Sequence, residues 1–316
     1  MVSDMNNEQT IQWFPGHMAK TRRQIAEVLP MVDVVAELLD ARIPRASRNP
    51  ELNAMIGGKP LVVILNKCDL ADPAVTAQWV SFFNRSGALT VAADCKTGTG
   101  LSALIPLIQN HLRDRFQALA EKGMTGRTPR ILVAGIPNVG KSSLINRLSD
   151  RARAKTEDRP GVTRKNQWYS VSDRSARTHP RQPGSKGSEN KKGAELLDTP
   201  GVLWPKFEDP EAGFNLAATG AVKDTLFDGE ALAMKLLERL SARYPSELGT
   251  RYKLGGFEEL NGEALLKLIA RKRGMLVSHG EPDLERAAAV VLDEFRAGKI
   301  GRISLEEPKF ETMFQT

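Results

Sequence analysis

The sequence predicts an α/β fold built on a largely parallel sheet, followed by a smaller helical region at the C-terminus. Three observations support this prediction. Short runs of continuous apolar residues, such as LVVIL at 61–65, are typical of strands that are buried on both faces of a sheet. Segments with helical periodicity alternate with these runs in the first two thirds of the chain. Beyond residue 205 only helical periodicity continues, so we predict domains at 1–205 and 206–316.

The apolar runs and the helical periodicity place the individual elements. Apolar runs predict strands at 32–39, 61–65, 88–93 and 131–134, and one that ends at 196–197. Helical spacing predicts helices at 18–29, 73–84 and 101–116, from 142 onward, and at 213–222, 229–242, 262–273 and 282–298.

Composition narrows the classes of protein to consider. The chain has 316 residues, 41% of them hydrophobic and 26% charged, which is ordinary for a globular protein. Its 45 basic and 38 acidic residues give a net charge of +7, which suits an anionic partner. Two cysteines are too few for a disulfide framework, and there is no apolar leader and no long apolar run. We therefore expect a cytoplasmic protein without a membrane partner, and a monomer.

A phosphate-binding loop is predicted between the strand at 131–134 and the helix that follows. Residues 135–142 read GIPNVGKS and match G-x-x-x-x-G-K-[ST]. Glycines let backbone N–H groups close around phosphate oxygens, and the helix N-terminus adds partial positive charge. Lysine then reaches the outer phosphates, and the first serine hydroxyl ligates Mg²⁺. The predicted phosphate ligands here are Asn138, Val139, Gly140, Lys141, Ser142 and Ser143, with Ser142 also on Mg²⁺.

A second motif indicates that the base is guanine. The strand at 61–65 runs into Asn66, Lys67 and Asp69, the N-K-x-D pattern of GTPases. The Asp69 carboxylate can accept two hydrogen bonds from guanine, which adenine cannot supply. A second base-contact loop is expected at 94–96, where Asp94, Cys95 and Lys96 stand in place of the usual Ser-Ala-Lys.

Two further motifs follow the phosphate-binding loop. Thr163, in PGVTR, is expected to close on Mg²⁺ and the γ-phosphate. DTPG at 198–201 is expected to hold Mg²⁺ through Asp198 and to sense the γ-phosphate through the Gly201 N–H. The base motif thus precedes the phosphate-binding loop, whereas a conventional small GTPase has them in the opposite order. The sequence therefore predicts a circularly permuted P-loop GTPase domain.

Several of these segments together resemble the YlqF/YawG family of circularly permuted GTPases. They are WFPGHMAK (13–20), LDARIPRASRNP (39–50), NKCDL (66–70), GIPNVGKSSLINRL (135–148), PGVTR (160–164) and LLDTPGVLWPK (196–206). The resemblance covers roughly residues 11–300. It implies a GTPase that binds GTP and GDP, acts in late assembly of the large ribosomal subunit, and contacts ribosomal RNA through a helical C-terminal domain.

Hydrolysis requires a group that orients the attacking water. Many GTPases use a glutamine directly after the DxxG motif, but that position here is Val202. A histidine in a turn, such as His17, is by itself either structural or catalytic; the resemblance favours His17 as the water-positioning group. The resemblance also assigns Asn138 to a possible K⁺ ion. Turnover is expected to be slow alone and faster with the ribosomal partner.

The sequence is also compatible with other interpretations. A nucleotide-gated RNA-binding adaptor, acting on the small subunit or another RNA, is the alternative function. A GTPase of membranes or cell division is disfavoured because no amphipathic or lipid anchor signal is present. The arginine-containing loop at 41–50 is either solvated or faces phosphate or RNA. The polar, basic segment at 171–193 is either a flexible tip or an RNA-binding loop.

Overall fold

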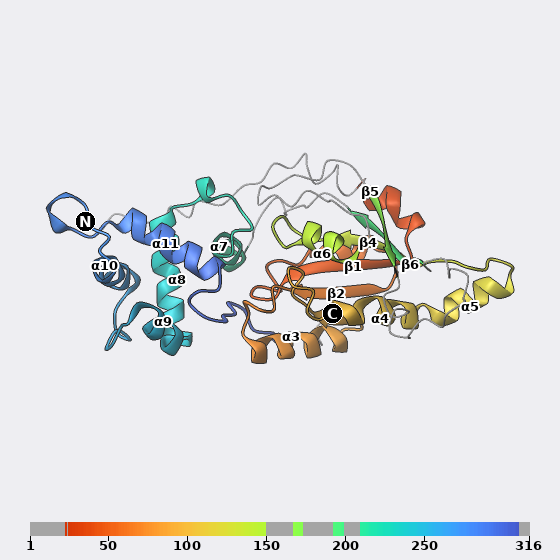
Figure 1. Cartoon of the computed structure of the whole chain (residues 1–316), viewed down its shortest axis with the longest axis horizontal. Coiled ribbons are helices and arrows are strands. Elements are labelled where there is room, and N and C mark those ends of the chain that lie inside the picture. Colours follow the sequence, from red (N-terminus) through yellow and green to blue (C-terminus); the bar gives the residue numbers. More distant parts are fainter. Residues whose placement is uncertain (1–22, 24, 150–166, 173–191, 199–208, 310–316) are drawn as a thin grey trace, which may run out of the picture. The chain divides into compact units, whose positions relative to one another are not determined.

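The computed structural model describes residues 23, 25–149, 167–172, 192–198 and 209–309 (Figure 1). These residues group into two compact units. One unit contains the described residues up to Asp198 together with 306–309, and the other contains 209–305.

The first unit is built on a six-stranded mixed sheet. The strand order is β3-β2-β1-β4-β6-β5, and every neighbouring pair is parallel except β5 and β6. The strands are β1 (Val34–Asp40), β2 (Leu61–Asn66), β3 (Leu89–Ala92), β4 (Arg130–Ala134), β5 (Gln167–Ser172) and β6 (Lys192–Asp198). The predicted α/β fold is confirmed. Strand β5 was not predicted, and β5 and β6 together include both ends of the segment at 171–193.

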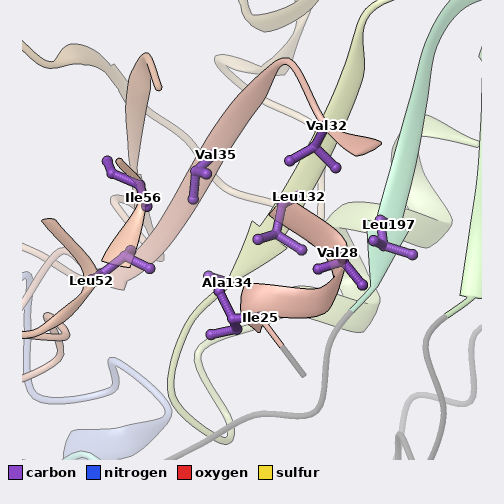
Figure 2. Close-up of a cluster of buried hydrophobic side chains, with 9 residues drawn as sticks. All are labelled: Ile25, Val28, Val32, Val35, Leu52, Ile56, Leu132, Ala134 and Leu197. Atoms are coloured by element: carbon purple, nitrogen blue, oxygen red, sulfur yellow. The ribbon is translucent and has the colours of Figure 1, made fainter. Parts of the chain in front are cut away.

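Continuous apolar runs form the central strands because apolar layers cover both faces of the sheet. Every residue of β1 is buried. One core cluster contains Ile25 and Val28, whose side chains point toward those of β1, β4 and β6 (Figure 2). Another core cluster contains Trp79 and Phe83 from α3 (Pro73–Arg85), packed with residues of β2.

The remaining helices of this unit connect the strands. They are α2 (Leu52–Met55), α4 (Leu104–His111), α5 (Arg113–Glu121) and α6 (Lys141–Leu148). The prediction of one continuous helix at 101–116 is wrong, because this region contains a 3-10 turn and two helices. A short 3-10 turn at Leu101–Ala103 precedes α4, and the helix is interrupted at Leu112, where ψ is 0°. Helix α5 then continues to Glu121, and none of its residues is buried.

The C-terminal segment at 306–309 packs on this first unit. The Glu306 carboxylate accepts hydrogen bonds from the backbone N–H groups of Arg45 (2.6 Å) and Ala46 (3.1 Å). The indole N–H of Trp79 donates to the Glu306 carbonyl oxygen at 3.2 Å. These bonds attach the segment to α3 and to the loop that follows β1.

The second unit is helical in its described residues. It contains α7 (Pro210–Ala218), α8 (Gly229–Arg243), α9 (Pro245–Tyr252), α10 (Gly262–Lys272) and α11 (Leu284–Arg296). Buried leucines on α8 recur at helical spacing, at Leu232, Leu236 and Leu240, and face a core shared with α10 and α11. Aspartate or asparagine side chains cap α7, α8, α10 and α11 through bonds to backbone N–H groups. Helix α9 was not predicted.

Candidate functional site

The candidate site lies at the carboxyl edge of the sheet. Because β1, β2, β4 and β6 are parallel, their carboxyl ends meet at one edge. Asp40 at the end of β1 is in register with Asn66 at the end of β2. Asp198 at the end of β6 is in register with Val133, just before the phosphate-binding loop. The sheet thus brings the base motif, the phosphate-binding loop and Asp198 to the same edge.

Two glycines of the phosphate-binding loop have conformations and surroundings that exclude a side chain. Gly135 has φ of +155°, and a Cβ there would lie 2.7 Å from the Leu38 carbonyl oxygen. Gly140 has φ of +104°, and a Cβ there would lie 2.3 Å from the Asn66 amide nitrogen. Asn138, between them, has φ of +58°. The loop therefore has the tight backbone path that lets N–H groups surround an anion.

One side chain connects three of the motifs. The Asn66 amide nitrogen donates to the Val139 carbonyl oxygen in the phosphate-binding loop at 2.6 Å. The Asn66 amide oxygen accepts from the Cys95 backbone N–H at 2.9 Å. Asn66 is buried, so both bonds are shielded from water. A single asparagine thus joins the base motif, the phosphate-binding loop and the loop at 94–96.

Lys141 is buried in the phosphate-binding loop at the start of α6. Its ammonium donates to the carbonyl oxygens of Gly135 and Ile136, both at 2.9 Å. Burial lowers the pKa of Lys141 to about 8, and the nearby charge of Asp198 partly offsets this effect. A cation that is desolvated in this way gains from a bound anion such as phosphate.

The Asp94 carboxylate stabilises the conformation of the loop at 94–96 through hydrogen bonds to neighbouring residues. Asp94 accepts from the Lys96 backbone N–H at 2.8 Å and from the Thr97 hydroxyl at 2.5 Å. Burial raises the pKa of Asp94, but these hydrogen bonds outweigh burial and lower it overall. The Cys95 thiol is buried, and burial raises its pKa to about 12. Because the Cys95 N–H already donates to Asn66, a guanine contact through this N–H requires an exchange of partners. That role stays a prediction.

Two residues of the base motif, Asp69 and Lys67, have different surroundings. Asp69 is exposed. Lys67 has φ of +60°, and its ammonium lies 3.1 Å from the Asp40 carboxylate. Asp40 is buried and also forms a bidentate pair with Arg42, at 2.9 Å and 2.7 Å. The motif therefore rests on a buried charge cluster at the end of β1.

The arginines of the loop at 41–50 have different surroundings: Arg45 is exposed, whereas Arg42 and Arg48 pair with buried carboxylates and fit neither interpretation of the sequence. Arg42 is 1% exposed and pairs with Asp40, so it faces neither solvent nor RNA. Arg48 lies 3.4 Å from the Glu37 carboxylate inside the sheet, and the Asn49 N–H donates to the same carboxylate at 2.7 Å. Sequence reasoning missed these roles. The available signal was acidic residues inside and at the end of a buried strand, followed within a few positions by arginines.

Four residues with predicted or discussed roles lie outside the described residues: His17, Thr163, Gly201 and Val202. Within the described part of the chain, no group of three or more histidine, cysteine, aspartate or glutamate side chains could hold a metal ion. In the same part of the chain, no helix has the length and apolar character needed to cross a bilayer.

The sheet and its carboxyl edge define a class of protein, the P-loop GTPases with circularly permuted motifs. A family model described as "50S ribosome-binding GTPase" matches residues 130–228. Ribosome biogenesis GTPase A of Priestia megaterium is 44% identical over 300 residues, which cover 95% of this chain and 97% of that protein. Mitochondrial ribosome-associated GTPase 1 of Mus musculus is 32% identical, with 96% and 92% covered.

Experimental structures show the same architecture. The GDP-bound YlqF structure superposes with a TM-score of 0.60 at 25% identity, covering 90% of this chain and 99% of that one. A GNP-bound YlqF from T. maritima superposes with a TM-score of 0.58. The chain belongs to the ribosome biogenesis GTPase A family. It is a GTPase with a role in ribosome assembly.

Proposed function

We propose that this GTPase binds a precursor of the large ribosomal subunit and is released after it hydrolyses GTP. Asn66 carries the nucleotide part of the proposal, because one buried side chain bonds to both the phosphate-binding loop and the second base loop. The description of the matching family and the names of the relatives support the ribosomal part.

The phosphates would bind to the loop at the start of α6. Backbone N–H groups of residues 138–143 would surround the phosphate oxygens, and the Lys141 ammonium would exchange its bonds to backbone carbonyls for bonds to phosphate. GTPases of this kind use Mg²⁺. Ser142, Asp198 and Thr163 are the proposed ligands, and Asp198 is the only carboxylate among them. This donor set fits Mg²⁺, which usually takes few protein carboxylates and is completed by phosphates and water.

The guanine base would bind between the two loops that Asn66 joins. Asp69 is exposed at the end of β2 and would accept from the two guanine N–H donors. The loop formed by Asp94, Cys95 and Lys96 would lie on the other side of the base. The hydrogen bonds of Asp94 to its own loop support a preformed shape there.

Hydrolysis would depend on a water-positioning group and on charge at the phosphates. Val202 cannot hydrogen-bond through its side chain, so the water-positioning group must come from elsewhere in the chain or from a partner; the family resemblance assigns this role to His17. A K⁺ ion at Asn138 would add positive charge near the phosphates. Intrinsic turnover would be slow, and groups organised by a partner can raise GTPase rates by about 10³–10⁵.

The helical unit would contact ribosomal RNA. Arg271 and Lys272 end α10, Arg273 follows them as the C-cap, and all three are exposed. Such a basic group suits a phosphate backbone, and its contribution should weaken as salt is raised.

The test is GTP turnover in potassium buffer with and without purified large ribosomal subunits, and with small subunits as the comparison. We expect strong stimulation by large subunits only. His17→Ala should abolish that stimulation, whereas His111→Ala, which changes an exposed histidine at the end of α4, should not. Turnover in sodium buffer should be slower than in potassium buffer.

The outcomes separate the parts of the proposal. Stimulation that survives His17→Ala keeps the ribosomal role and discards His17. Equal turnover in sodium and potassium discards the K⁺ assignment. Stimulation by small subunits, or by neither, contradicts the large-subunit role and favours the nucleotide-gated RNA adaptor.

A further inference from the structure

Asp40 is a charged side chain that is buried at the carboxyl end of a mostly apolar strand. It ends β1, whose other residues are apolar except Glu37, and it is 3% exposed. Its backbone N–H donates to the Ser47 hydroxyl at 3.1 Å. Burial alone would raise the pKa of the Asp40 carboxyl, but the charges of Arg42 and Lys67 outweigh burial and hold this pKa well below its usual range. Asp40 is therefore an anion beside two cations.

Arg42 already satisfies the structural requirement of this anion. Its guanidinium binds both carboxylate oxygens, and its backbone N–H donates to one of them at 3.1 Å. A bidentate arginine pair neutralises one carboxylate. The 3.1 Å contact with Lys67 is thus an additional interaction, which removes freedom from a long, flexible side chain.

Lys67 lies where its conformation affects the base site. It stands between Asn66, which bonds to the phosphate-binding loop, and the rest of the base motif with Asp69. Its left-handed backbone, φ +60°, directs the chain at the end of β2, and its side chain is 24% exposed. A lysine whose ammonium is held at one end presents its four-carbon stem as an apolar surface, which suits the face of a purine.

We propose that Asp40 is a positioning residue for guanine binding, and that it acts by holding the Lys67 ammonium so that the lysine stem lines the base site. The proposal rests on the proposed guanine site at Asn66–Asp69. Arg42 and Ser47 in turn hold Asp40, so the loop after β1 supports base recognition without touching the nucleotide.

The chain contains a matched control at the other end of the same strand. Asp33, directly before β1, is fully buried and also has arginine partners. Arg127 donates to it at 2.9 Å, and the Arg130 backbone N–H donates at 3.1 Å. Asp33 lies at the amino edge of the sheet, away from the base site. Its substitution therefore measures the effect of losing a buried, paired carboxylate that has no contact with the base motif.

The experiment measures the Kd of a fluorescent GDP analogue, together with thermal unfolding, for Asp40→Asn, Lys67→Met, their double variant and Asp33→Asn. Asp40→Asn and Lys67→Met should each raise Kd by about tenfold, which corresponds to about 1.4 kcal/mol. The double variant should bind about as weakly as Lys67→Met alone, because Asp40 acts through Lys67. Asp33→Asn should lower the Tm but leave Kd within about twofold.

An unchanged Kd in Asp40→Asn, or effects that add in the double variant, would overturn the proposal. If Asp40→Asn does not fold, Lys67→Met decides: a weaker Kd at an unchanged Tm supports the proposal, and an unchanged Kd overturns it. Failure of the unsubstituted protein to bind the analogue would instead contradict the guanine site itself.

Discussion

The two edges of the central sheet contain the same kinds of residues but differ in what those residues contact. At the amino edge, Asp33 binds Arg127 and the backbone N–H of Arg130 at the start of β4, and Lys59 donates to the Val32 carbonyl oxygen at 2.7 Å. At the carboxyl edge, Asp40 and Asn66 bind residues of the nucleotide motifs. Burial and pairing alone therefore do not identify a functional charge. A functional charge is identified by its position at the carboxyl edge of a parallel sheet.

The largest expected difference between the edges concerns a glycine. Gly140→Ala places a Cβ at φ +104° and 2.3 Å from the Asn66 amide nitrogen, so it should weaken GDP binding by at least about a hundredfold, or about 3 kcal/mol. Gly87→Ala at the amino edge has φ +84° but nothing within 4 Å of the new Cβ. It should cost only about 1–2 kcal/mol of stability. Isothermal titration and urea unfolding of both variants measure the two effects. Equal loss of GDP affinity in both variants would contradict the distinction.

The next largest effect is expected from comparing Asn66 at the carboxyl edge with Lys59 at the amino edge. Asn66→Ala removes the partner of the Val139 carbonyl and the Cys95 N–H, so unfolding free energy should fall by about 2 kcal/mol and GDP Kd should rise about tenfold. Lys59→Met removes one bond at the amino edge and should cost about 1 kcal/mol without changing Kd. A Kd that responds to Lys59→Met would show that the edges are coupled.

The pH dependence of stability tests the buried Glu37, which lies inside β1 and supports the loop after it. Burial raises the pKa of Glu37 from its ordinary 4.5 to about 7, although Arg48 and the Asn49 N–H lower it. The folded state therefore holds this proton more tightly than the unfolded state between these values, and the stability of the protein falls as pH rises through this window. The Glu37→Gln variant lacks this titrating carboxyl group, so it should not show this pH dependence.

The urea-unfolding difference between Glu37→Gln and the unsubstituted protein should therefore shift in favour of the variant by about 2 kcal/mol from pH 5.5 to pH 8. A constant difference across this range would mean that Glu37 is not a titrating, desolvated group.

The smallest effect concerns the attached C-terminal segment. Glu306→Ala removes the acceptor of the Arg45 and Ala46 N–H groups and should lower the unfolding free energy of the first unit by about 1 kcal/mol. Glu307→Ala changes an exposed neighbour and serves as the control. Differential scanning calorimetry compares them. Equal Tm values would mean that the segment contributes no stability through this carboxylate.

The sequence predicted the core strands and the permuted motif order because continuous apolar runs and short motifs are local signals. The apolar run at 61–65 corresponds to β2, and the helices predicted at 229–242 and 262–273 correspond to α8 and α10. The interruption at Leu112 and strand β5 were missed, because a single break in periodicity and an edge strand of mixed polarity leave weak local signals.

The charge network around the site was also missed, for a different reason. Arg42 appears in a polar loop, and its burial depends on Asp40 at the end of a strand and on the packing of that loop. Likewise, nothing local in Asn66 indicates that it bonds to Val139, which is 73 positions away. Such contacts follow from the register of the sheet, which motif patterns do not specify.

The most direct test of the account is base specificity at the carboxyl edge. We would measure Kd for GDP, ADP and xanthosine diphosphate with the unsubstituted protein and with Asp69→Asn. The unsubstituted protein should prefer GDP over both others by at least about a thousandfold, because another base would cover the Asp69 carboxylate without supplying the two guanine N–H donors. Asp69→Asn should prefer xanthosine diphosphate, since an amide can donate to the xanthine oxygen. Comparable binding of ADP and GDP, or an unaltered preference in Asp69→Asn, would contradict the assignment of this edge as the guanine site.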